Sequence, residues 1–165
     1  MKYFPLSEAQ KRIWYSQKKY KESPLYNIGG TVKILGTIEL ASLKQEIEFV
    51  YWNNDALRLR YLEKDNKILQ YISEENFYVF AVFRIDANLM GYFIKIHHIN
   101  ADGWSIKLLT EQVKTAYEQI IHEKNVSVER KPSYLDYVKR EEQYLISEAC
   151  KTAGEYWKRK FSVLP

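Results

Sequence analysis

The sequence predicts an α/β fold, a two-layer sandwich in which helices cover a mixed, largely antiparallel sheet. Three observations support it: an amphipathic helical pattern opens the chain, strand-like segments cluster in the middle, and helical patterns fill the last third. Only 6 Gly and 4 Pro residues occur among 165, so long elements with short connections are expected. This is the length of one ordinary domain, and we expect residues 1–165 to form a single domain.

Boundary signals define the elements of the first third. Ser7–Gln10 has the Ser-x-x-Gln spacing of a capping box, which predicts a helix over Glu8–Tyr20. The Ser-Pro pair at Ser23 ends that helix. β-branched residues then predict a strand over Tyr26–Leu35. Apolar residues at 3-4-3 spacing predict a second helix over Leu40–Asn53.

The rest of the chain divides into clustered strands followed by helices. Alternating or continuous apolar runs predict four strands, at Leu57–Glu63, Lys67–Ile72, Phe77–Asp86 and Gly91–His98. A helical period follows over Trp104–His122, and a polar connection runs over Glu123–Lys131. The Pro-Ser pair at Pro132 is a helix-start signal, and Tyr134–Phe161 is typical of one or two amphipathic helices.

Composition and charge exclude several classes of protein. The net charge is +4, but basic and acidic residues are interspersed, so no nucleic-acid partner is expected. No run of 18 apolar residues is present and the start lacks the apolar core of a secretory signal, so no membrane association is expected. The single cysteine, Cys150, allows neither an internal disulfide nor a multi-thiolate metal site, which favours a cytoplasmic location.

One segment, Ile96–Ser105, combines two adjacent histidines with an aspartate and a glycine. Neighbouring residues of a strand point to opposite faces, so His98 would share a face with Ile96, and His97 would lie on the other. Two such rings cannot converge on one atom, and we expect no metal site. The rings would instead have separate roles, one held by hydrogen bonds in the packing and one at the strand end, where a neutral imidazole can accept a proton.

A purely structural interpretation of the same residues stays open. His97 and His98 would then be two hydrogen-bonded histidines at a strand end. Asp102 would be only the N-cap of the following helix, with its carboxylate accepting from backbone N–H groups. Gly103 tolerates unusual backbone angles and a close approach of another group, so it fits either interpretation.

Four segments, in order, resemble the motifs of one known family. His97-His98-x-x-x-Asp102-Gly103 matches the HHxxxDG motif of the condensation domains of non-ribosomal peptide synthetases. Ser7–Trp14 resembles the SxAQxRxW motif of that family, Asp55–Tyr61 resembles its ExLRTxF, and Tyr134–Tyr137 resembles its YxDY. The chain is therefore identified as similar to these condensation domains.

The resemblance implies a two-lobe enzyme of which this chain is the N-terminal lobe, chloramphenicol acetyltransferase-like in fold, with the C-terminal lobe absent. In the family, phosphopantetheine arms of acyl or peptidyl carrier proteins bring two thioesters into a tunnel between the lobes, and an amide forms. The arms are substrates, and no bound cofactor or metal is implied.

The resemblance also assigns roles to five residues of this chain. His98 would be the catalytic histidine that orients or deprotonates the attacking amine. His97 and Asp102 would hold the shape of the loop, Asp102 by pairing with an arginine for which Arg58 is the candidate. Gly103 would let the backbone approach the reacting thioester.

Three functions remain possible on these grounds. The chain can be a condensation lobe that needs a C-terminal lobe to act, or a self-associating acyltransferase in which a second copy completes the site. It can also be a non-catalytic module that docks a carrier protein. The stretch between Ile72 and Tyr92 is shorter than is usual in the family.

Overall fold

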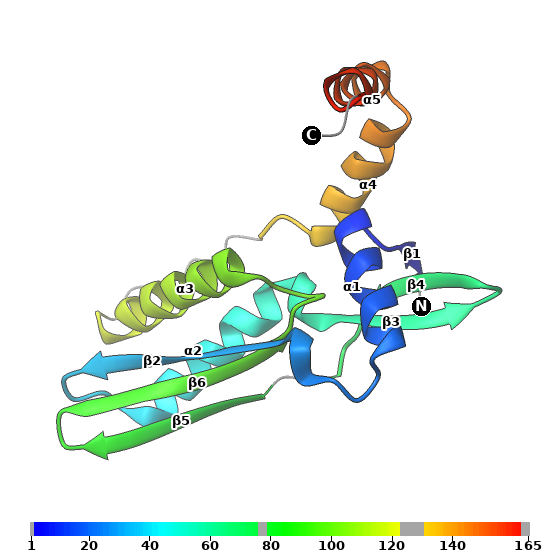
Figure 1. The fold of residues 1–165 in the computed structure, drawn as a ribbon. Helices are drawn as coiled ribbons and strands as arrows, with labels where there is room; N and C mark the ends of the chain where they lie inside the picture. The colour runs from blue at the N-terminus through cyan, green and yellow to red at the C-terminus, as the bar shows by residue number, and fades with distance from the viewer. Residues whose placement is uncertain (1, 76–78, 123–130, 163–165) are drawn as a thin grey trace. The chain divides into compact units, whose positions relative to one another are not determined.

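The computed structural model describes residues 2–75, 79–122 and 131–162 (Figure 1). The chain forms two compact units, residues 1–131 and 132–165. The first contains two separate three-stranded sheets, here called sheet A and sheet B, with three α-helices. The second contains two helices.

Sheet B has the strand order β2-β6-β5 and is antiparallel throughout. Its strands are β2 (Asn27–Leu35), β5 (Val79–Asp86) and the central β6 (Leu89–His97). Successive residues of β2 alternate between exposed and half-buried. One face of the sheet therefore packs on the core while the other faces outward.

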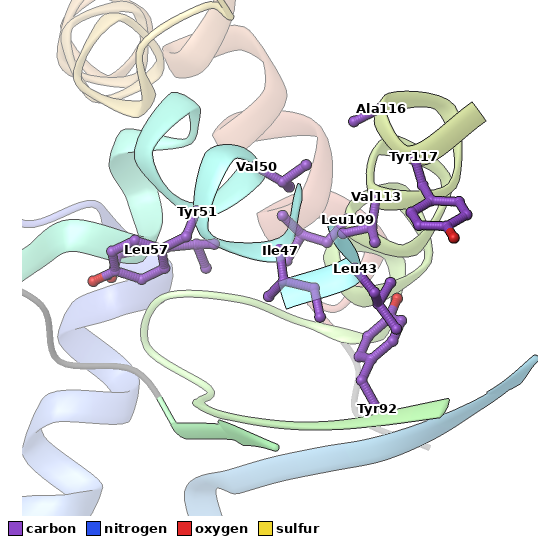
Figure 2. Packing of buried hydrophobic residues seen from close by; sticks show 10 residues of the cluster. All are labelled: Leu43, Ile47, Val50, Tyr51, Leu57, Tyr92, Leu109, Val113, Ala116 and Tyr117. Carbon is purple, nitrogen blue, oxygen red and sulfur yellow. The ribbon is translucent and has the colours of Figure 1, made fainter. Parts of the chain in front are cut away.

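Two helices cover the inner face of sheet B, as the packing in Figure 2 shows. They are α2 (Leu40–Asn53) and α3 (Gly103–Ile121). Tyr92 of β6 extends from the sheet toward Leu43 of α2. The buried cluster consists of Leu43, Ile47, Val50, Tyr51, Leu57, Tyr92, Leu109, Val113, Ala116 and Tyr117.

Sheet A has the order β1-β4-β3 and is also antiparallel. It is built from β1 (Phe4–Pro5), β3 (Leu59–Lys64) and β4 (Lys67–Ile72). The β3–β4 hairpin turns at Asp65 and Asn66, whose φ angles of 52° and 57° are both positive. A two-residue turn of this kind matches the right-handed twist of its strands, and Asp and Asn tolerate that conformation.

Helix α1 (Glu8–Lys19) begins at the capping box predicted from the sequence. The Ser7 side chain accepts from the Gln10 backbone N–H, and the Gln10 side chain accepts from the Ser7 backbone N–H. Two 3₁₀ turns complete the unit, η1 (Pro24–Tyr26) before β2 and η2 (Asp55–Arg58) before β3.

The second unit consists of α4 (Tyr134–Leu145) and α5 (Glu148–Lys160). Ser133 and Ser147 are their N-caps, each accepting a backbone hydrogen bond with its side chain. On α5 the exposed Trp157 ring stacks on Phe161, with centroids 5.6 Å apart and planes inclined by 11°.

The structure confirms the α/β class and most of the element positions predicted from the sequence. The largely antiparallel sheet is realised as two separate antiparallel sheets rather than one. The strand predicted from Leu57 starts at Leu59, because η2 extends to Arg58. The predicted connection over 123–130 and the first residues of the predicted strand over 77–86 lie outside the described residues. None of the helices formed by the described residues is long and apolar enough to cross a bilayer.

Helix α2 carries a buried carboxyl group. Glu46 is 2% exposed, and its Oε2 has no hydrogen-bond partner among the described residues. Burial raises the pKa of Glu46, because desolvation disfavours the charged form. The folded chain therefore binds more protons than the unfolded chain near the ordinary pKa of 4.5, so this group reduces stability as pH rises above that value.

We predict that Glu46→Met raises the free energy of unfolding at neutral pH by about 1 kcal/mol, since it removes an unpaired buried carboxylate. The gain should shrink toward about pH 4, where the carboxyl group is protonated in the folded chain. Urea denaturation across this pH range measures it. Gln45→Met, at an exposed neighbouring position, is the control. An equal gain at both pH values would contradict the assignment.

Candidate active site

The two histidines lie where β6 ends and a tight loop begins. His97 is the last residue of β6 and pairs with Asn27 of β2. The His98 backbone N–H donates to the Tyr26 carbonyl at 2.7 Å, and the Asn100 N–H donates to the His97 carbonyl at 2.9 Å. Helix α3 then starts at Gly103. His98 thus lies one residue beyond the strand, at the start of a loop, here called the His98 loop, of residues 98–102.

The His98 ring is held by a single hydrogen bond to its own loop. Its Nδ1 lies 2.8 Å from the Ala101 carbonyl oxygen. A carbonyl only accepts, so Nδ1 carries the hydrogen and the neutral ring has its lone pair on Nε2. Nε2 has no hydrogen-bond partner among the described residues, and the residue is half-buried. This ring can accept a proton at Nε2 from a group placed beside it.

The His97 ring has the opposite tautomer and two partners. Its Nδ1 accepts from the Ile99 backbone N–H at 3.2 Å, so its hydrogen is on Nε2, which lies 3.4 Å from Gln17 Oε1. Burial lowers the pKa of His97, and the neighbouring His98 lowers it further. Both nitrogens are occupied in the folded chain. The His97 ring therefore holds the loop against α1 and has no bare nitrogen for chemistry.

Asp102 is the N-cap of α3. One carboxylate oxygen accepts from the Ser105 backbone N–H at 2.8 Å and from the Ser105 hydroxyl at 2.7 Å. These hydrogen bonds lower the pKa of Asp102. At Gly103 an added Cβ would meet nothing within 4 Å. The start of α3 therefore borders open space.

The expected pairing of Arg58 with Asp102 is absent, since no ion pair joins them among the described residues. The Arg58 guanidinium instead lies over the Trp52 ring, 5.2 Å from its centroid. Two local structures explain the difference. The 3₁₀ turn η2 places Arg58 beside Trp52 at the end of α2, and Asp102 uses one carboxylate oxygen, Oδ1, to cap its own helix.

Sequence reasoning missed a buried amide group behind the site. Gln10 of α1 is 2% exposed and its Nε2 donates to the Tyr61 hydroxyl and to Gln70 Oε1, both at 3.0 Å. The Tyr61 hydroxyl lies 2.5 Å from Asn100 Oδ1 in the His98 loop. Gln10 and Tyr61 both fall inside the recognised motifs, but the motifs do not reveal that the two side chains meet.

An apolar cavity of about 490 Å³ opens within the first unit. It lies among sheet B, α2, α3 and the start of β3, and the polar residues among its lining include His97 and Gln17. His98 is not among the lining residues. The aliphatic and aromatic side chains from the sheet and the two helices that line it are Ile47, Val50, Tyr51, Val79, Phe80, Tyr92, Ile94, Ile96, Ile106, Leu109 and Val113.

Within residues 2–75, 79–122 and 131–162, no group of three or more His, Cys, Asp or Glu side chains is arranged to hold a metal ion.

A family model described as condensation domain matches the chain in two blocks, residues 1–86 and 76–165. The chain belongs to the condensation-domain family. Among similar proteins, surfactin synthase subunit 1 of Bacillus subtilis (strain 168) is 24% identical over 99% of this chain. A dimodular nonribosomal peptide synthase of the same organism is 27% identical over 98% of it.

Solved condensation domains share the fold. The starter condensation domain of rhizomide synthetase matches with a TM-score of 0.90 at 21% identity over 100% of this chain. The first condensation domain of the calcium-dependent antibiotic synthetase, in complex with a substrate analogue, matches with a TM-score of 0.86 at 18% identity. These matches confirm the fold expected from the motifs.

The match covers the N-terminal portion of a condensation domain. The chain spans 49% and 48% of the two solved structures, and 6% and 8% of the two synthases. Both synthase alignments run over 203 positions, more than the 165 residues of this chain, so the relatives carry additional residues within the matched span. The two blocks of the family match overlap over residues 76–86, within the stretch expected to be short.

The lowered pKa of His97 gives a testable dependence of stability on pH. The folded chain keeps this ring neutral, so it binds fewer protons than the unfolded chain below the ordinary pKa of 6.5. The free energy of unfolding is therefore unaffected by His97 above that pH, and it decreases as the pH falls toward the lowered pKa of His97. We predict that His97→Gln, which retains a donor toward Gln17, reduces the loss of unfolding free energy between about pH 7.5 and about pH 5.

Urea denaturation of both proteins at the two pH values measures this difference. An identical acid-side loss in the variant would show that His97 is not the group responsible.

Proposed function

We propose that this chain acts as the N-terminal lobe of a peptide-synthetase condensation domain. It contributes the HHxxxDG loop to amide-bond formation between carrier-bound aminoacyl or peptidyl thioesters. The observation that carries this is the hydrogen bond from His98 Nδ1 to the Ala101 carbonyl, which leaves Nε2 bare. The family match over the whole chain supports the same assignment.

The proposed reaction uses His98 as a proton acceptor. The α-amine of the acceptor attacks the carbonyl carbon of the donor thioester, and a C–N bond forms. The amine proton passes to His98 Nε2 or is held there during the attack. The C–S bond then breaks, and the thiol of the donor phosphopantetheine leaves with a proton. The acceptor carrier retains the lengthened chain.

The other loop residues orient His98. His97 contacts Gln17 and the Ile99 backbone, and Asp102 caps α3, so both ends of the loop are fixed. Gly103 borders open space at the N-terminus of α3, where a thioester could approach the backbone. The Arg58 side chain packs on Trp52, and in this proposal its role is to support the start of β3.

The proposed partners are a C-terminal condensation lobe and two carrier proteins. This chain covers about half of the solved condensation domains, so a second lobe would supply the facing wall of the site. The net charge of +4 suits docking of an acidic carrier. Action in the cytoplasm agrees with the single cysteine, Cys150.

We predict that the chain, mixed with a C-terminal condensation lobe and two carriers loaded with aminoacyl-phosphopantetheine, forms a dipeptidyl thioester that mass spectrometry detects. His98→Ala should reduce the rate by about 100-fold or more, the usual scale of lost acid–base catalysis. His122→Ala, at the exposed end of α3, is the matched control and should retain full activity.

Each result of this experiment decides between the functions. Amide formation without an added lobe would favour a self-associating acyltransferase, in which a second copy of the chain forms the other side of the site. Carrier binding without amide formation, unaffected by His98→Ala, would identify a docking module and overturn the catalytic proposal.

A further inference from the structure

A buried polar network connects sheet A to the His98 loop. Gln10 and Gln70 are 2% and 0% exposed, and Gln10 Nε2 donates to Gln70 Oε1 at 3.0 Å. Gln70 Nε2 donates to the Pro5 carbonyl at 2.7 Å, and Gln10 Oε1 accepts from the Ser7 backbone N–H at 2.9 Å. The two buried amides are thus paired, and a satisfied buried network specifies one arrangement of its members.

Tyr61 links this network to the loop. Its hydroxyl accepts from Gln10 Nε2 at 3.0 Å, and it has one hydrogen to donate. Asn100 Oδ1 lies 2.5 Å away and the Ile99 carbonyl 3.4 Å away, so the hydrogen is donated to Asn100. Asn100 Nδ2 then faces the Leu59 carbonyl at 3.5 Å. Two contacts to β3 hold one side chain of the loop in a single orientation.

We infer that Tyr61 and Asn100 are positioning residues that fix the tautomer of His98. Asn100 directly precedes Ala101, whose carbonyl holds His98 Nδ1. An Asn100 side chain clamped to β3 fixes the backbone on which that carbonyl stands. The pair therefore determines that Nδ1 is hydrogen-bonded and Nε2 is bare. The inference rests on the role proposed above for His98.

The loop has local contacts of its own, such as the Asn100 N–H donating to the His97 carbonyl at 2.9 Å, and Tyr61 adds one from a distant strand. The His97 contacts fix its start, and the Asp102 cap fixes its end. Asn100 lies between them, and Ile99 and Ala101 have no polar side chain. Among the described residues, Tyr61 is the donor that reaches the Asn100 side chain, from a position 39 residues earlier in the chain.

The test compares Tyr61→Phe, Asn100→Leu and the double variant of the 165-residue chain. Tyr71→Phe is the matched control, because Tyr71 lies on the neighbouring strand β4 and its ring contacts Tyr3, outside the network. Two quantities are measured for each: Tm, and the ¹⁵N chemical shifts of the His98 ring, which distinguish the two neutral tautomers. A change in packing alone moves these shifts slightly but does not exchange the Nδ1 and Nε2 values that identify the tautomer.

The inference predicts that each single variant lowers Tm by several degrees, because buried partners lose their hydrogen bond. Each should also add the Nε2–H form of His98 to the spectrum. The double variant should contain no more of the Nε2–H form of His98 than either single variant, since the same Tyr61–Asn100 contact is lost in all three. Tyr71→Phe should leave the His98 spectrum unchanged.

A lower Tm with an unchanged His98 spectrum would overturn the inference and leave the network a purely structural role. Additive shifts in the double variant would overturn it too. If Tyr61→Phe does not fold, Asn100→Leu decides alone, because it keeps the Tyr61–Gln10 hydrogen bond. These measurements need no substrate. A negative result here would therefore refute the positioning role of Tyr61 and Asn100 without bearing on the condensation assay, and the reverse also holds.

Discussion

The candidate site depends on one hydrogen bond, from His98 Nδ1 to the Ala101 carbonyl. Imidazole has two nitrogens, and only the one without hydrogen can accept a proton. In His98 the Ala101 carbonyl of the loop backbone determines that Nδ1 carries the hydrogen and Nε2 does not. His97, the adjacent residue, has the opposite tautomer because the Ile99 N–H donates to its Nδ1. Two neighbouring side chains of the same type thus have different chemical capacities, set by backbone groups three and two residues away.

The loop obtains its shape from both sheets of the first unit. Sheet B ends at His97, which defines where the loop begins, and sheet A reaches the loop through Tyr61. Helix α1 joins the two contacts, since Gln10 bonds Tyr61 and Gln17 lies beside His97. Motifs that are far apart in the sequence are therefore in direct contact. The first motif, around Ser7–Trp14, supports the loop that carries the HHxxxDG motif.

Sequence reasoning succeeded where the signal is local. The Ser7 capping box, the β-branched residues of β2 and the helical period of α2 each predicted an element that the structure contains. It failed where the outcome depends on a partner distant in sequence. The ion pairs of the described residues do not include the expected Arg58–Asp102 pair, and Arg58 lies over the Trp52 ring instead.

The Tyr61–Asn100 contact and the tautomers of the two histidines could not be predicted at all. They depend on distances across the fold rather than on spacing along the chain. The division into two sheets has the same origin. Strand β4 pairs on one edge with β3, its neighbour in the chain, and on the other with Phe4–Pro5, at the start of the sequence.

His98, and not His97, offers a bare ring nitrogen. Diethyl pyrocarbonate acylates unprotonated imidazole nitrogens. Brief treatment at neutral pH, followed by peptide mass spectrometry, therefore shows which histidine has an accessible bare nitrogen. The account predicts rapid modification of His98 and protection of His97, with exposed His122 as an internal reference for the reagent. Modification of His97 before His98, or a His98 that resists the reagent while His122 reacts, would contradict it.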